Sequence, residues 1–165
     1  MLRIIRVGMA AGFFLLAVAA QAADVKVTGV YNCCGACKAA ITKALTDGGA
    51  TNINVEGRNV SFAAEDPVKA VTALYEAGFT GKVEGATVRN TSGARGVKGK
   101  TISVEKVHNC CPNCVKDINT AVKAVGTTDA KPRETSFTVS SDNEIEATAV
   151  VRALRDAGFN AHIKK

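Results

Sequence analysis

Hydrophobic and polar positions follow one order twice along this chain of 165 residues. Alternating apolar residues predict a strand, and apolar residues three and four apart then predict a helix. Two strands, a second helix and a last short strand follow. In the first half these six elements are marked by Val25 and Val27, Ile41 and Leu45, Ile53 and Val55, Val60 and Phe62, Val71 and Leu74, and Val83. This order is that of the split βαβ unit, so we predict an α+β fold with two ferredoxin-like βαββαβ domains in tandem.

The second half is a copy of the first. Residues 30–51 match residues 107–128 at a constant offset of 77, with identities that include Asn32/Asn109, Ile41/Ile118 and Gly49/Gly126. Further on, Ala77-Gly78-Phe79 matches Ala157-Gly158-Phe159 at an offset of 80. The second copy has therefore gained three residues, which we place between its third strand and its second helix.

Two details of the copies bear on the fold. Asp66 followed by Pro67 predicts the start of the second helix of the first copy, with Asp66 as N-cap. In the second copy the third strand is clear at Phe137 and Val139, but the second strand is poorly marked, by Ala130 and Pro132. The second strand of this fold lies at an edge of the sheet, where one missing donor is tolerated.

The N-terminus has the pattern of a secretory signal peptide, which we assign to residues 1–23. Two arginines precede an apolar run from Val7 to Ala20, and Ala20-Gln21-Ala22 is a small-residue cleavage signal. The run is too short and too interrupted by glycine for a membrane span, although an uncleaved anchor is the alternative. We expect a periplasmic or secreted protein with no stable membrane insertion after signal cleavage.

The remaining boundaries follow from composition. We predict a first domain at 24–84, a flexible linker at 85–100 and a second domain at 101–165. The linker is rich in Gly, Ser and Thr and carries four basic residues but no acidic one. The formal net charge of +6 includes two arginines of the signal peptide, and each domain is near neutral. No basic face for nucleic acid is predicted.

The six cysteines of the protein all fall in two N-C-C-x-x-C stretches, one in each copy, between the first strand and the first helix. A C-x-x-C pair that spans a loop and a first helical turn directs both sulfurs at one point and suits the soft ions Cu(I), Hg(II) or Zn(II). The positive end of the helix lowers the thiol pKa. We predict about one ion per domain, bound by the cysteines Cys33, Cys34, Cys37, Cys110, Cys111 and Cys114.

Several roles stay open at this stage. Cys33 and Cys110 either complete a three-sulfur site, bridge to a second ion or form a disulfide within their loop. His108 is one further candidate ligand in the second site, whereas His162 is interpreted as non-functional. The pattern does not decide whether the two copies bind separately or close on one ion.

The cysteine loops and the Ala-Gly-Phe corners resemble the heavy-metal-associated domain of copper chaperones, of the tails of metal-transporting ATPases and of the periplasmic mercury-binding protein. The resemblance implies metal binding at Cys34/Cys37 and Cys111/Cys114. It also implies transfer to, or capture for, a membrane metal transporter or another metal-binding domain. That family usually has Gly-Met before the x-C-x-x-C, where this chain has Tyr31-Asn32 and His108-Asn109.

The last candidate site residues are the phenylalanines of the two Ala-Gly-Phe corners. Phe79 and Phe159 each follow the glycine that ends the second helix of their copy. That corner lies near the cysteine loop in a ferredoxin-like unit. The two rings therefore either cover the metal site or simply pack in the core.

Two other functions compete with metal binding. The first is a thiol–disulfide redox protein, since strand, C-x-x-C and helix also occur in thioredoxin-like proteins. The second is a set of disulfides that staple small domains, which the clustering of the cysteines disfavours because a bond within one loop closes only a short ring. No nucleophile–base pair and no phosphate-binding loop is present, so we do not expect an enzyme.

Overall fold

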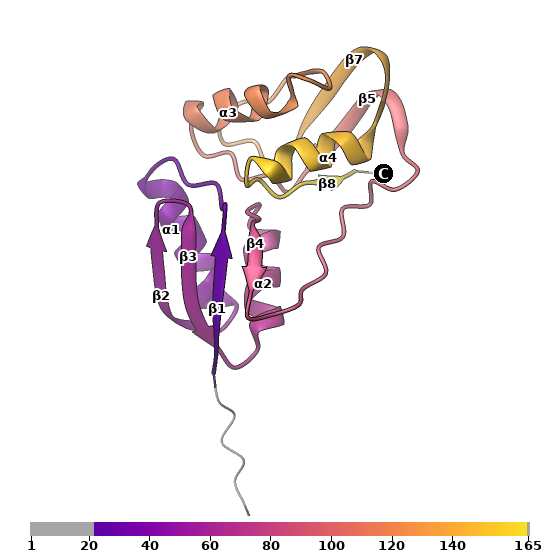
Figure 1. Cartoon of the computed structure of the whole chain (residues 1–165). Helices are drawn as coiled ribbons and strands as arrows, with labels where there is room; N and C mark the ends of the chain where they lie inside the picture. The colour runs from indigo at the N-terminus through magenta and orange to yellow at the C-terminus, as the bar shows by residue number, and fades with distance from the viewer. Residues whose placement is uncertain (1–21, 165) are drawn as a thin grey trace, which may run out of the picture.

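The computed structural model of the chain describes residues 22–164. That part of the chain forms four helices and two four-stranded antiparallel sheets, which confirms the α+β class. Figure 1 shows the two units in contact, with a long segment of chain connecting them at one side. The first unit comprises β1 (Ala23–Thr28), α1 (Gly35–Asp47), β2 (Ala50–Glu56), β3 (Asn59–Ala64), α2 (Pro67–Glu76) and β4 (Lys82–Glu84). The second comprises β5 (Lys98–Glu105), α3 (Pro112–Val122), β6 (Thr127–Thr128), β7 (Phe137–Glu146), α4 (Ala147–Asp156) and β8 (His162–Ile163).

The strand order is the same in both sheets. It is β2-β3-β1-β4 in the first unit and β6-β7-β5-β8 in the second. All neighbouring strands are antiparallel, and each sheet carries its own pair of helices. The topology is compatible with two ferredoxin-like units, and the predicted edge position of the second strand is confirmed in both.

The predicted alternation of β1 is also confirmed. Val25 and Val27 are buried, while Asp24 and Lys26 between them are exposed. On the covering helix, Ile41 is fully buried at the predicted helical spacing. Burying each such side chain contributes about 1.5–3 kcal/mol, so this apolar face is what holds the helix on the sheet.

The second helix of the first unit begins where the sequence predicts. Asp66 is the N-cap of α2, and its side chain accepts a hydrogen bond of 2.9 Å from the backbone N–H of Lys69. Pro67 occupies the first helical position, where its missing N–H has no intrahelical partner to lose.

The three extra residues of the second copy lie within β7, the third strand itself, and not between that strand and α4 as predicted, because β7 runs directly into α4. Strand β5 pairs Thr101 with Ser140 and then Gly99 with Ile145. A step of two residues along β5 therefore opposes a step of five along β7, and the difference of three is a bulge in the longer strand. The insertion is absorbed at one end of the sheet and does not disturb the cysteine loop at the other.

The second strand of the second unit differs from the prediction. Strand β6 contains only Thr127 and Thr128, so Ala130 and Pro132 lie outside it, in the connection to β7. Proline has no N–H to donate to a ladder. The connection also contains Arg133 with a φ of +71°, a left-handed conformation that interrupts regular pairing.

The predicted signal peptide and the predicted linker flank the first unit. Most of the predicted signal peptide lies outside the described residues, but Ala23 already pairs with Ala64 in β1 and β3. Within residues 22–164, no helix has both the length and the apolar character that crossing a bilayer requires.

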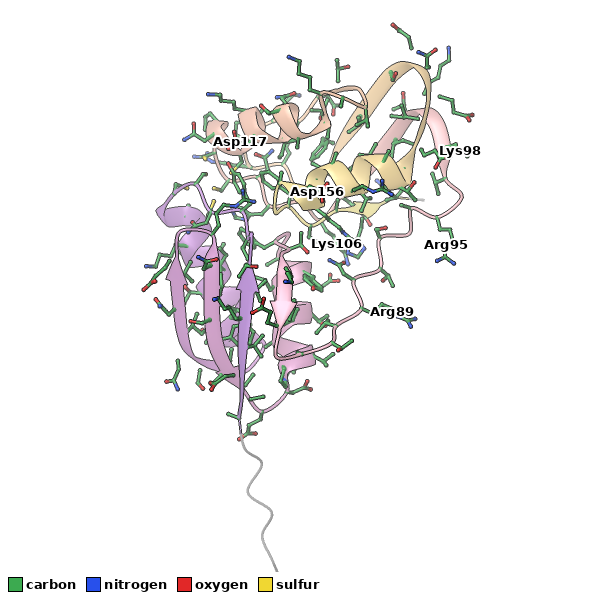
Figure 2. The ribbon with its side chains drawn as sticks, in the orientation of Figure 1. Arg89, Arg95, Lys98, Lys106, Asp117 and Asp156 are labelled. Carbon is green, nitrogen blue, oxygen red and sulfur yellow. The ribbon has the colours of Figure 1, made fainter. Side chains whose placement is uncertain are left out.

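The segment predicted as a linker runs along the molecule, and Arg89 and Arg95 point outward from it (Figure 2). Its last three residues belong to β5.

That segment contacts the second unit at several points. Ala94 is 2% exposed, and the carbonyl of Ser92 accepts a 2.7 Å hydrogen bond from the backbone N–H of Ile163. Asn90 accepts hydrogen bonds from the Arg155 guanidinium through its own backbone and side-chain oxygens. These contacts place Asn90 at the junction of the two units.

Candidate metal centre

Each cysteine loop joins the end of the first strand of a unit to the start of its first helix. Cys34 and Cys111 are the N-cap residues of α1 and α3, both with extended backbone. Cys37 and Cys114 follow in the first helical turn and are fully buried. The N-terminal ends of α1 and α3 lie where the two units meet, so the two loops face one another (Figure 1).

The structure brings all six predicted cysteines into one cluster, and all six are free thiols. Eight pairs of Sγ atoms lie 3.6–3.8 Å apart. Four of these pairs join one loop to the other, and they are Cys33–Cys111, Cys33–Cys114, Cys34–Cys110 and Cys37–Cys110. The two loops therefore form one thiol cluster between the units.

Within the cluster, four triads of sulfurs have the spacing of a metal site, with all members within 4.8 Å of one another. Three of the triads take cysteines from both loops. The triads are Cys33/Cys37/Cys114, Cys33/Cys34/Cys111, Cys34/Cys37/Cys110 and Cys110/Cys111/Cys114. The cluster could hold a metal ion, and Cys33 and Cys110 are as much a part of it as the C-x-x-C pairs.

The helix termini and burial act in opposite directions on the thiols. The backbone N–H groups of Cys37 and Ala36 at the start of α1 lower the pKa of Cys34 to about 6. Donation from these N–H groups stabilises the negative charge of the thiolate and so favours the ionised form. The N–H of Cys114 likewise lowers the pKa of Cys111. The helix effect predicted from the sequence is confirmed for these two cysteines.

The deeper thiols behave differently. Burial raises the pKa of Cys33, Cys37 and Cys110, because a thiolate loses solvation there. A metal cation close to the sulfurs would reverse this preference, since a coordinating thiol is deprotonated outright. The cluster thus combines two thiols that ionise readily with others whose ionised form needs a positive charge nearby.

The Ala-Gly-Phe corners hold the two units together. The carbonyl of Gly158 accepts hydrogen bonds from the N–H groups of Tyr31 and Thr80, at 3.2 and 3.1 Å. In the matching place, the carbonyl of Gly78 accepts from His108 and Asn160, at 3.3 and 2.9 Å. Each corner is therefore bonded to the residue that lies two positions before the first cysteine of the other unit.

The aromatic residues of the corners stack across the contact between the units. Phe159 stacks on Tyr31 of the first unit, with ring centroids 3.9 Å apart, and Phe79 stacks on His108 of the second at 4.2 Å. Both phenylalanines are fully buried. The rings position the cysteine loop of the opposite unit, which is a role the sequence did not suggest.

The two histidines take no part in the thiol cluster. His108 was a candidate ligand, but it belongs to none of the sulfur triads. Its ring is committed to the stack on Phe79, and burial lowers its pKa. His162 pairs with Glu105 as part of β8. Sulfur ligands alone define the site.

Arg58 adds a further tie that sequence analysis missed. It lies in the turn between β2 and β3. Its guanidinium donates to the carbonyls of Gly29 and Ala157 at 2.8 and 2.7 Å, so it spans the two units. Tyr31 also donates from its hydroxyl to Asp117 of α3, at 2.8 Å, and Figure 2 labels Asp117 at this junction. Both contacts join the two units next to the first cysteine loop.

Each loop is fastened to its own unit by the asparagine before its first cysteine. The Asn32 side chain donates to the carbonyl of Gly57 at 2.7 Å, and the Asn109 side chain donates to the carbonyl of Lys131 at 2.6 Å. These two hydrogen bonds tie each loop to the connection between the second and third strands of its own unit.

We expect Asn109→Ala to lower the free energy of unfolding by about 1–3 kcal/mol and Asn32→Ala by less, because only Asn109 is buried and leaves an unpaired carbonyl behind. Urea unfolding of the reduced, metal-free variants measures both. Equal losses for the two variants would contradict this explanation.

Comparison with protein-family models and with curated proteins finds no match to this chain. Its function therefore has to be inferred from the thiol cluster itself.

Proposed function

We propose that the protein is an exported binding protein for soft metal ions, which holds Cu(I), Hg(II) or Zn(II) through thiolates of its two N-C-C-x-x-C loops. The observation that carries the proposal is the cluster of six free sulfurs, drawn from two loops far apart in the sequence, with Cys34 and Cys110 separated by 76 positions. Thiols are weak hydrogen-bond donors and acceptors, so six of them gain little from contacting one another. Soft cations are the partners that thiolates bind strongly.

The resemblance to heavy-metal-associated domains supports the same function. The signal-peptide pattern supports a periplasmic or secreted location. We expect binding without catalysis, in the service of sequestering the ion or of passing it to a membrane transporter or to another metal-binding domain. Cys34 and Cys111 are partly exposed, whereas Cys37 and Cys114 are fully buried. Cys33 and Cys110 are partly exposed as well, so a recipient's thiolates would meet these four cysteines before the two buried ones.

A Cys34→Ser/Cys111→Ser variant is the direct test. Serine keeps the size of the side chain but is a much harder ligand, and three of the four triads contain at least one cysteine of this pair. We expect the reduced protein to bind Cu(I), Zn(II) or Hg(II) tightly and the variant to lose most of this binding. Titration against a competing chelator, under anaerobic conditions, measures the affinity and ranks the ions.

Thr42→Ser, at an exposed position of α1, is the matched control and should bind as the unchanged protein does. Circular dichroism of both variants checks that the fold is kept. No tight binding of any of the three ions by the reduced protein would exclude the proposal.

One observation favours thiol–disulfide exchange as a second candidate. The Sγ atoms of Cys34 and Cys37 lie 3.8 Å apart, and the pKa of Cys34 is lowered to about 6, as in reactive C-x-x-C motifs. A redox function predicts reduction of insulin by the protein and a reduction potential near that of its compartment. A potential below about −300 mV would instead indicate a stable bond without exchange function.

A further inference from the structure

The short Sγ–Sγ distances define a particular arrangement of the six sulfurs. No two of the four triads share a pair, so together they define twelve pairs of Sγ atoms within 4.8 Å. Each sulfur occurs in two triads and thus has four close neighbours. Six points with four neighbours each form an octahedron. The opposite corners are Cys33 and Cys110, Cys34 and Cys114, and Cys37 and Cys111.

A single ion at the centre does not fit this octahedron. Eight of its twelve edges are 3.6–3.8 Å and the other four are within 4.8 Å, so the centre lies about 2.6 Å or more from the sulfurs on average. Bonds between thiolates and ions such as Zn(II) are ~2.3 Å. An octahedron also has no four corners that are all neighbours, so it does not offer the tetrahedral four-sulfur site that Zn(II) prefers.

The triangular faces do fit. The Cys34/Cys37/Cys110 triad, with sides of 3.7–3.8 Å, has its centre about 2.1–2.2 Å from each sulfur, close to the ~2.3 Å of a metal–thiolate bond. The sides of the other three triads are all within 4.8 Å. Ions in adjoining faces would lie only about 1.7 Å apart, so only alternate faces can be filled. An octahedron has four alternate faces, in which any two share one corner. The four triads of the metal centre are one such set. The same twelve pairs also close the other four faces, which include Cys33/Cys34/Cys37, so the complementary set of alternate faces has the same connectivity.

We propose that the two loops together hold four Cu(I) ions in a cage of six bridging thiolates, one ion in each alternate face. The proposal rests on the proposed function and specifies its ion, its stoichiometry and its site. Three sulfurs per ion suit the soft, monovalent Cu(I). Six neutral thiols and four Cu(I) ions give the cage, with a net charge of 2−, and six protons are released. No electron is transferred.

The cage belongs to neither unit alone. Only one of its four faces, Cys110/Cys111/Cys114, comes from a single loop, and the other three mix both loops. Separation of the units leaves at most one three-sulfur face in each loop, so at least two of the four sites are lost. Since each thiolate bridges two ions, binding of the first ions orders the ligands of the others, and loading is cooperative.

Anaerobic titration of the reduced protein with Cu(I), followed by native mass spectrometry, tests the stoichiometry. We expect a species with four copper ions to appear early, with little of the forms that carry one, two or three. X-ray absorption of that species should show three sulfurs per copper and a copper–copper distance of about 2.5–2.8 Å, as expected for ions near the centres of alternate faces. One or two ions per protein, or four ions without a copper–copper distance, would overturn the cage while leaving the proposed function intact. No binding of any soft ion would exclude both.

Single substitutions separate the cage from independent loops. Cys33→Ser removes a corner of two faces, so the number of tightly bound ions should fall from four to two, and Cys110→Ser should do the same from the other loop. With Thr42→Ser as control, four ions should remain. If Cys33→Ser instead keeps all four ions, the octahedral assignment is wrong.

Discussion

The double variant Gly78→Ala/Gly158→Ala is expected to separate the two units while each keeps its own fold. A Cβ at Gly78 would collide with the backbone of His108, and a Cβ at Gly158 would collide with the backbone of Gly29 and Tyr31. Both glycines also have a positive φ, +89° and +93°, which costs a side-chain-bearing residue about 1–2 kcal/mol each. The two glycine corners bring the cysteine loops together. The number of copper ions held in mixed triads should therefore fall when the corners are forced apart.

Small-angle scattering of the double variant should show a larger radius of gyration than the unchanged protein, and copper titration should show fewer bound ions. Gly49→Ala is the matched control, because Gly49 has a φ of +85° but nothing within 4 Å of an added Cβ. It should cost a similar amount of stability and leave the units in contact. A double variant that keeps both the compact shape and the full copper content would contradict the assigned role of the corners.

Asn160→Ala is expected to destabilise the contact between the units by about 1–3 kcal/mol for each group that it leaves unpaired. Asn160 is fully buried, its side chain donates to the carbonyl of Tyr75 at 2.7 Å, and it accepts from Asn90 at 2.9 Å. The substitution leaves the carbonyl of Tyr75 and the side-chain amide of Asn90 without these hydrogen-bond partners. No water reaches these groups to compensate when the residue is fully buried.

Urea unfolding of the reduced protein, followed at probes in both units, measures the effect. Asn143→Ala, at an exposed position of β7, is the control and should change the free energy of unfolding by less than about 0.5 kcal/mol. Similar losses for the two variants would show that Asn160 does not join the units.

The shared cluster bears on how the protein would use its metal. Ions held between two units are enclosed by both, which suits sequestration. The ion pair between Lys106 and Glu76 crosses the same contact, and Figure 2 labels Lys106 there, but it is half-exposed and contributes little. Transfer would instead require a recipient to compete at the four partly exposed cysteines, or the units to part. Glycine carbonyls, stacked rings and Asn160, together with the thiol cluster, set how readily they part.

Much of each unit was predictable from local patterns. Period-two and helical spacing located the strands and helices, because one face of each element must be buried. The repeat located the three-residue insertion between the two matching stretches, because the offset has to change at an intervening position. The structure places it inside β7 as a bulge, and not after the strand as predicted. The prediction was wrong at β6, where Pro132 lies in a connection and not in a strand.

The sequence by itself determined the two α+β units, the order of their strands and the six sulfurs as ligand candidates, because these depend on residues near one another in the chain. Tertiary structure alone decided that the two cysteine loops form one site. That outcome depends on contacts between distant residues. Gly78 and Gly158 lack a side chain where they meet the backbone of His108 and of Tyr31, about 30 and 127 positions away in the sequence. Phe79 and Phe159 stack on rings of the opposite unit, and the buried side chain of Asn160 donates to a carbonyl of the first unit. Contacts between distant residues leave no periodic pattern in a single sequence. The sequence could therefore predict a metal site in each loop, but only the fold shows that the two loops face one another.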